Sequence, residues 1–370
     1  MILIKNCDLY APESVGFKDI LIGGGRILLV DDSISCDLDC IDVIDARGEI
    51  VHPGFIDGHV HVLGGGGEDG MLSRVPPLSE KKVVSAGVTT LVGLLGTDGY
   101  TRTVRDLVAK IQGFNEWGLS AYCLTGSYQI PTITLTGSVA DDIIWIKEVI
   151  GVKVAISDHR CSFPTTEELL RLASEVRLAS LMSHKVGLVH IHVGADPRAI
   201  EQLFEIHEMC PIPISHFYPT HMEGHMDMAK RWLDIGGHID LTCHSDTDKK
   251  AIELLEKYPE NVTLSTDSNG SFPKWNNDKT AIVGMGAGSI AELDHYVQRM
   301  IDSGFDRTLT YKSVTENPAK AMKLTKKGRI AKGMDADIVI RDGDSIRYVI
   351  ANGEILLREG IAKDSMYEGV

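Results

Sequence analysis

Eight apolar runs of seven or eight residues alternate with amphipathic segments along the middle of the chain. They begin at residues 55, 89, 120, 151, 186, 214, 238 and 262. The spacing of 24 to 35 residues between successive starts leaves room for a strand, a helix and two loops in each unit. Eight such units are typical of a TIM (β/α)8 barrel. The sequence therefore predicts an α/β protein built on this barrel.

Three of the segments between the runs carry apolar residues at helical spacing. They cover residues 138–150, 165–182 and 290–301. Apolar residues that recur every three or four positions lie on one face of a helix, which then packs on the sheet. We therefore expect helices in these segments.

Both ends of the chain have a different pattern, with short β-rich runs separated by turn residues. Gly23 to Gly25 separate two such runs near the start, and Asn352-Gly353 is a hairpin dipeptide near the end. We predict a small, discontinuous β-sandwich domain made of residues 1–53 and 326–370. Residues 54–325 would then form the barrel.

The charge pattern excludes some classes of partner. The net charge is −15 and there is no basic block, which argues against binding to nucleic acid or to an anionic membrane surface. No apolar run approaches the ~18 residues of a membrane span, and the N-terminus lacks the pattern of a secretory signal. The seven cysteines are scattered, as expected for reduced thiols. A cytoplasmic protein is the expectation.

Two histidines in the first run point to metal binding. His59 and His61 are two residues apart, so a strand would place both side chains on one face, where two imidazoles can bind a metal ion. His190 and His192 form a second pair of this kind. In a chain with 14 histidines such a pair also arises by chance, so the pair alone leaves the question open.

The positions of further polar residues favour the metal site. Active sites of TIM barrels lie at the carboxyl ends of the strands. Potential ligands occur in five of the eight predicted strands, mostly at their ends: His59, His61, Lys153, His192, His221 and Asp267. Six groups meeting at one rim are much less probable by chance than one pair.

Lys153 is an unexpected member of this set, because metal ions repel an ammonium group. Two nearby cations would lower its pKa and favour the neutral amine, which can react with carbon dioxide to form an anionic carbamate. The alternative is an ordinary lysine that pairs with Asp158 or another acid.

Several stretches closely resemble the isoaspartyl (β-aspartyl) dipeptidases of the amidohydrolase superfamily. They are FIDGHVHVLGGGGEDG, LVGLLGTD, LTGSYQIP, GVKVAISDHR, the PTH of HFYPTH, and STDSNGS. Their order and spacing agree with the family across nearly the whole chain, including the terminal β-rich blocks. The resemblance implies a homo-oligomer and a small dipeptide as the substrate.

The resemblance also implies a binuclear zinc centre that cleaves the β-aspartyl isopeptide bond with a metal-activated hydroxide. His59, His61 and Asp267 would bind one zinc ion, and His192 and His221 the other. Carbamylated Lys153 and the hydroxide would bridge the two ions. Asp267 would transfer the proton from the attacking water to the leaving amine, and the Tyr128 hydroxyl would stabilise the oxyanion.

For the substrate, the resemblance implies that Glu68 binds the free α-amino group. Arg160 and Ser271 would bind the α-carboxylate of the aspartyl unit, with further polar contacts from Gly66 and Thr97.

One position departs from the family pattern. Gly224 occupies the place of an arginine that helps to bind a substrate carboxylate. Losing a charged hydrogen bond costs on the order of 1.5 to 3 kcal/mol. The site therefore loses a charge unless a neighbour such as His225 or Lys230 substitutes for this arginine.

Other functions remain open at this point. A cyclic amidase acting on hydantoin or dihydroorotate rings, or an N-acyl amino acid deacylase, could use the same metal ligands. The acidic Glu68 favours a substrate with a free amine, which the ring substrates lack. A non-catalytic scaffold would be expected to lose ligands, and none of the six is missing. His190 is predicted to be a hydrogen-bonded core residue rather than a ligand.

Overall fold

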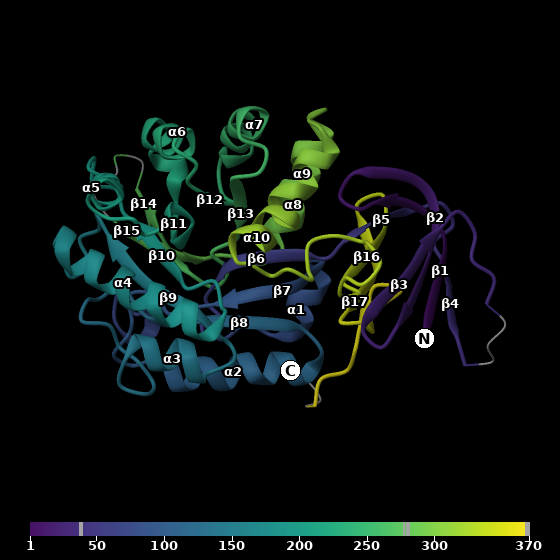
Figure 1. Cartoon of the computed structure of the whole chain (residues 1–370), viewed down its shortest axis with the longest axis horizontal. Helices are drawn as coiled ribbons and strands as arrows, with labels where there is room; N and C mark the ends of the chain where they lie inside the picture. Colours follow the sequence, from purple (N-terminus) through teal and green to yellow (C-terminus); the bar gives the residue numbers. More distant parts are fainter. Residues whose placement is uncertain (37–39, 277, 279–281, 367–370) are drawn as a thin grey trace.

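The predicted strands of the middle of the chain are present. The computed structural model describes residues 1–36, 40–276, 278 and 282–366 (Figure 1). Each of the eight apolar runs contains a strand: β6 (Phe55–Val60), β7 (Val88–Gly93), β8 (Ser120–Gly126), β9 (Val149–Ile156), β10 (Leu188–Val193), β11 (Phe217–Thr220), β12 (Ile239–Thr242) and β13 (Val262–Ser265). All but one of their residues are buried, as parallel strands covered on both faces require; Tyr122 of β8 is partly exposed.

These strands are parallel to one another. Six of them form a sheet in the order β11-β10-β9-β8-β7-β6, and β12 pairs with β13. Beyond β13, Ser268 forms a parallel bridge with Val60, and its carbonyl accepts a 2.8 Å hydrogen bond from the His61 amide. The segment after β13 is thereby joined to β6, at the other end of the six-stranded sheet. The fold is α/β with a parallel half-barrel, and the carboxyl ends of its strands lie on one side.

Helices connect the strands and cover the outside of this sheet (Figure 1). They are α1 (Glu80–Ser85), α2 (Val104–Trp117), α3 (Val139–Trp145), α4 (Thr166–Ser183), α5 (Glu201–Met209), α6 (Met226–Asp234), α7 (Thr247–Lys257), α8 (Glu292–Asp302), α9 (Arg307–Val314) and α10 (Glu316–Ala321). The predicted helices over 165–182 and 290–301 correspond to α4 and α8. A capping box begins α4, in which Thr165 and Glu168 satisfy each other's backbone amides.

The prediction for residues 138–150 was partly wrong. The helix α3 ends at Trp145, and Val149 and Ile150 belong to β9. These two β-branched residues are buried in the sheet, where such side chains pack well. Burial in the sheet therefore overrides the apolar periodicity that suggested a longer helix.

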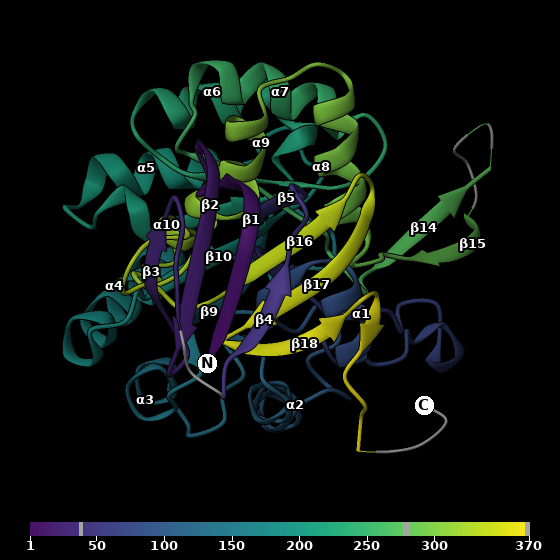
Figure 2. The same ribbon diagram turned by 90° about the vertical axis from the view of Figure 1, so that its right-hand side faces the viewer.

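The two ends of the chain form one sheet (Figure 2). Its nine strands are β1 (Ile2–Tyr10), β2 (Ser14–Gly23), β3 (Arg26–Asp31), β4 (Asp42–Asp45), β5 (Ile50–Pro53), β16 (Ile338–Asp342), β17 (Ser345–Ala351), β18 (Glu354–Arg358) and β19 (Ile361–Ala362). The antiparallel pairing of β5 with β16 joins the two blocks. Asn352 and Gly353 turn with φ of 49° and 76° between β17 and β18, as the hairpin dipeptide predicts.

One hairpin was not predicted. The strands β14 (Ser271–Trp275) and β15 (Ile282–Ala287) pair with each other and project from the body of the molecule (Figure 2). The base of this hairpin places Ser271, Phe272 and Met285 beside the carboxyl ends of the strands.

Two further findings concern the described residues as a whole. Every helix among them is too short or too polar to cross a lipid bilayer. All seven cysteines are free thiols, in agreement with the prediction.

Candidate metal centre and substrate cavity

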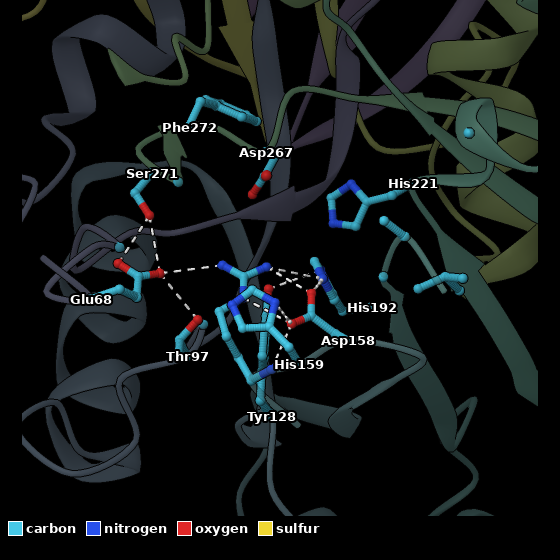
Figure 3. A pocket seen from close by; sticks show the side chains of 18 of the residues that line it. Glu68, Thr97, Tyr128, Asp158, His159, His192, His221, Asp267, Ser271 and Phe272 are labelled. Atoms are coloured by element: carbon cyan, nitrogen blue, oxygen red, sulfur yellow. Dashed lines mark hydrogen bonds and ion pairs between the residues drawn. The ribbon is translucent and has the colours of Figure 1, made fainter. Parts of the chain in front are cut away.

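A cavity of about 880 Å³ opens at the carboxyl ends of the strands (Figure 3). Most of the predicted site residues line it: His61, Gly66, Glu68, Thr97, Tyr128, Arg160, His192, His221, Asp267 and Ser271. Two predicted metal ligands, His59 and Lys153, are fully buried and approach the same groups from the protein interior. The structure thus brings predicted site residues from seven of the eight strand–loop units to one place, and β12 supplies none of them.

The two histidines of the first run approach the same carboxylate. His59 Nε2 lies 3.3 Å and His61 Nε2 2.9 Å from Oδ1 of Asp267. This buried oxygen nevertheless lacks a hydrogen bond of acceptable geometry. A buried carboxylate oxygen without a hydrogen bond is costly, and a cation between it and the imidazoles would satisfy it. The three side chains therefore fit a metal ion.

Backbone geometry at the strand ends directs two of the candidate ligands into the cavity. His221 follows β11 directly and Asp267 lies two residues beyond β13, and both adopt left-handed conformations with φ of 65° and 49°. Residues other than glycine seldom adopt this conformation, and such strain gathers at functional sites. Ligand atoms of His59, His221 and Asp267 all lie within 4.8 Å of one another.

Lys153 lies beside these ligands in a fully buried position. Its Nζ is 3.4 Å from His59 Nε2, and no ion pair between Lys153 and a carboxylate occurs within the described part of the chain. Burial lowers the pKa of Lys153 to about 7, against the opposing influence of Asp267 and Asp240. A large fraction of this amine is therefore neutral near pH 7.

His192 has a defined orientation at the cavity wall. Its Nδ1 lies 2.8 Å from the Tyr128 hydroxyl, and its Nε2 lies 2.8 Å from Oδ2 of Asp158. The His192 and His221 rings are 4.6 Å apart between centroids. With Nε2 donating a hydrogen bond to Asp158, Nδ1 carries the lone pair and accepts a hydrogen bond from the Tyr128 hydroxyl. Carboxylates commonly orient metal-binding histidines in this way.

Asp158 lines the cavity but was not among the site residues predicted from the sequence. It accepts hydrogen bonds from Nε and NH2 of Arg160 at 2.9 and 2.8 Å, in a bidentate arrangement. Burial raises the pKa of the Asp158 carboxyl, but the hydrogen bonds from Arg160 and His192 outweigh it and hold that pKa well below its usual range. The only sequence signal was the Asp-x-Arg spacing within SDHR.

Glu68 and Asp158 contact Arg160 through different nitrogens of its guanidinium group. The Glu68 carboxylate accepts hydrogen bonds from Thr97 at 3.1 Å, from Ser271 at 3.2 Å and from NH1 of Arg160 at 3.4 Å. Gly66, two residues before it, has a φ of 74°, and a Cβ there would come within 2.4 Å of the Ser73 carbonyl oxygen. Only glycine fits at position 66, so the loop can place Glu68 at the rim of the cavity.

The wall around Gly224 differs from the expectation. Lys230 does not line the cavity, because its ammonium pairs with Glu253 on the surface of α6 and α7, so of the two possible substitutes for the arginine it is the one that is excluded. His225 does line the cavity, with its Nε2 2.8 Å from the Gly194 carbonyl oxygen. Space is open around Gly224, since a Cβ added there would meet no atom within 4 Å.

His190 lies beneath the candidate ligands. It is fully buried, and its Nε2 is 3.2 Å from Nδ1 of His59. Thr220 Oγ1 lies 3.3 Å from the same nitrogen of His59. These neighbours of Nδ1 leave Nε2 of His59 directed toward Asp267 and Lys153.

Comparison with known sequences assigns the class of the protein. Residues 50–363 match the sequence profile described as the Amidohydrolase family, which covers most of the chain. The chain therefore belongs to the amidohydrolase family and is a hydrolase of that family.

A narrower similarity confirms the resemblance predicted from the motifs. The chain is 39% identical to the β-aspartyl dipeptidase of Fervidobacterium islandicum AW-1 in complex with the β-Asp-Leu dipeptide, with a TM-score of 0.94 over 99% of this chain and 100% of that one. A second structure of that dipeptidase matches at 38% identity with a TM-score of 0.92 and the same coverage.

More distant relatives are more diverse. Adenine deaminases from Clostridium botulinum and Bacillus pumilus are 22% and 25% identical over 96% and 98% of this chain. The chain spans 56% and 58% of their lengths, so it matches little more than half of each. The D-hydantoinase of Thermus sp. shares the fold, with 17% identity and a TM-score of 0.68 over 99% of this chain and 97% of that one.

Proposed function

We propose that this protein is a binuclear zinc hydrolase that cleaves the isopeptide bond of β-aspartyl dipeptides. The proposal depends on two features that occur together in one cavity. Metal-ligand candidates cluster around Asp267 at its floor, and Glu68 beside Arg160 at its rim offers a binding place for an α-amino acid. The similarity to a dipeptidase solved with β-Asp-Leu supports the same assignment.

In this proposal His59, His61 and Asp267 bind one zinc ion, and His192 and His221 bind the other. Lys153, carbamylated on Nζ, would bridge the two ions. The neutral, buried amine of Lys153 supports this modification, because a neutral amine is the form that reacts with carbon dioxide. The carbamate would also supply negative charge where the chain otherwise provides mainly imidazoles.

The two zinc ions would polarise the scissile carbonyl and activate a water molecule. Asp267 would accept the proton of that water and donate it to the leaving amine. Its pKa supports the accepting form at neutral pH: burial raises the value, but contact with His61 and the charges of His221 and Lys153 lower it to about 2. The buried Tyr128 hydroxyl would donate a hydrogen bond to the developing oxyanion.

The rim of the cavity would bind the aspartyl unit. Glu68 would accept hydrogen bonds from the α-amino group, and Arg160 and Ser271 would donate to the α-carboxylate. Thr97 and the backbone at Gly66 would add polar contacts. Thr97, Ser271 and Arg160 already converge on Glu68, so this group of side chains is arranged before the substrate binds.

Cyclic amidases and N-acyl amino acid deacylases are the alternatives within the family. Their substrates lack a free amine, so Glu68 at the rim would have no substrate amino group to bind. This observation favours the dipeptide.

Some broader properties belong to the same proposal. The strands of residues 54–325 would close into a full TIM barrel, and residues 1–53 and 326–370 would form a β-sandwich domain, the last four residues lying outside the described part. We also propose a cytoplasmic homo-oligomer that binds neither nucleic acid nor membranes.

The proposal is tested by incubating zinc-loaded protein with β-Asp-Leu, α-Asp-Leu, hydantoin, dihydroorotate and adenine, and following the products by chromatography. We expect cleavage of β-Asp-Leu in strong preference to the others. Preference for a ring substrate, or inactivity with metal bound, would contradict the dipeptidase assignment.

A further inference from the structure

Two further basic side chains, His244 and Lys250, line the cavity that Gly224 also lines. Glu223, the residue before this glycine, has its Oε1 3.3 Å from Nε2 of His244, and its Oε2 accepts a hydrogen bond from the Thr242 amide. Glu223 is thus held by the end of β12 and in turn holds His244, which follows the strand. Lys250 of α7 also lines the cavity.

These residues and Glu68 come from different parts of the chain. The loops after β6 to β9 supply Glu68, Thr97, Tyr128 and Arg160, whereas the segments after β11 and β12 supply Gly224, His244 and Lys250. A dipeptide whose aspartyl unit binds among the first group would place its second amino acid against another part of the cavity lining, where His244 and Lys250 offer basic groups.

Two other basic side chains of the cavity have closer partners. Nε and NH2 of Arg160 both donate to Asp158, and its NH1 is directed to Glu68. His225 is engaged with the Gly194 carbonyl. Lys250, by contrast, has only a half-exposed contact of 3.4 Å with Asp246, which is of the kind that contributes little. His244 is half exposed toward the cavity and has its ring 6.0 Å from that of Phe272.

We infer that His244 and Lys250 bind the α-carboxylate of the leaving amino acid and so determine specificity for a free C-terminus. This inference rests on the proposed dipeptidase function. The two cations would replace the missing arginine at position 224, with Glu223 keeping the His244 ring in place and favouring its protonated form. Imidazolium and ammonium groups both donate charged hydrogen bonds to a carboxylate.

The inference is tested with two substrates that differ in one charge, β-Asp-Leu and β-Asp-leucinamide. The variants are His244→Gln and Lys250→Met, and both substrates retain the complete aspartyl unit. We expect each variant to raise KM for β-Asp-Leu by about tenfold, with kcat little changed, and to alter KM for the amide by less than about twofold.

The matched control is Lys249→Met, on the exposed face of the same helix, which should raise KM for neither substrate. A further variant adds Gly224→Arg to the double substitution His244→Gln, Lys250→Met. Because the space beside Gly224 is open, the arginine should restore the preference for β-Asp-Leu over the amide.

The outcomes separate the two proposals. If the unmodified protein cleaves neither substrate, the dipeptidase function fails. If it cleaves both, and the two variants weaken both substrates equally or neither, the carboxylate-binding role of His244 and Lys250 is overturned while the dipeptidase function stands.

Discussion

The carboxylate of Asp158 joins His192 to Arg160. Its Oδ2 lies 2.8 Å from Nε2 of His192 and accepts a 2.8 Å hydrogen bond from NH2 of Arg160. In the proposed enzyme one of these partners binds zinc and the other binds the substrate carboxylate. Asp158 would therefore position both.

Replacing Asp158 by asparagine tests this double role. The amide keeps the shape of the side chain but removes the charge that both partners share. We expect zinc affinity, measured by competition with a chelator, to fall by about tenfold to a hundredfold. KM for β-Asp-Leu should rise as well. Asp302→Asn, on the exposed end of α8, is the control and should change neither quantity. If the zinc affinity of Asp158→Asn is unchanged, Asp158 does not position His192 for zinc binding.

Replacing Lys153 by alanine should remove metal and activity together. Without the bridging carbamate, the remaining ligands carry too little negative charge for two zinc ions. A short carboxylic acid such as acetate fits the space of the lost side chain and should restore part of both. Zinc content by atomic absorption and β-Asp-Leu hydrolysis, with and without acetate, are the measurements. Full zinc content and full activity in Lys153→Ala would exclude the bridging role.

Tyr128→Phe separates transition-state stabilisation from metal binding. The phenol of Tyr128 is 2.8 Å from Nδ1 of His192, and the substitution removes only its oxygen. We expect kcat to fall by about a hundredfold to a thousandfold, as for other oxyanion donors, with two zinc ions retained. A fall in zinc content instead would show that the Tyr128 hydroxyl positions His192 for metal binding.

The binding of β-Asp-Leu should depend on the protonation of His244. The nearby Glu223 carboxylate and the charge of Asp267 raise the pKa of His244 above its ordinary value, outweighing partial burial, while Phe272 contributes no charge. Below that pKa the ring is a cation and binds a carboxylate; as the pH rises through it, the charge is lost and KM increases.

The measurement is KM for both substrates from about pH 6 to about pH 9, a range that brackets a raised histidine pKa. KM for β-Asp-leucinamide should not show this increase with pH, which we call the step. Glu223→Gln should move the step for β-Asp-Leu to lower pH. A pH profile shared by the two substrates would assign the titration to another group.

The strands could be predicted from the sequence because buried parallel strands read as continuous apolar runs. The ends of the strands could not. His61, His221 and Asp267 were placed within strands, yet each lies beyond the last paired residue. Their backbone conformations depend on contacts between distant segments, such as the hydrogen bond from the His61 amide to the Ser268 carbonyl.

The missed elements have weak local signals. The hairpin of β14 and β15 contains glycines and a proline, and within the described residues its strands pair only with each other. They therefore do not need the apolar run of a core strand. Asp158 and Glu223 act through partners that are 34 and 21 residues away in the chain, His192 and His244. Without the fold, neither acid differs from an ordinary surface carboxylate.

The most direct test of the central claim is a zinc titration of metal-free protein during hydrolysis of β-Asp-Leu. We predict that aspartate and leucine are released only as zinc binds, and that activity reaches its maximum at about two zinc ions per chain. Full activity in the metal-free protein, or two bound zinc ions without release of aspartate and leucine, would contradict a binuclear β-aspartyl dipeptidase.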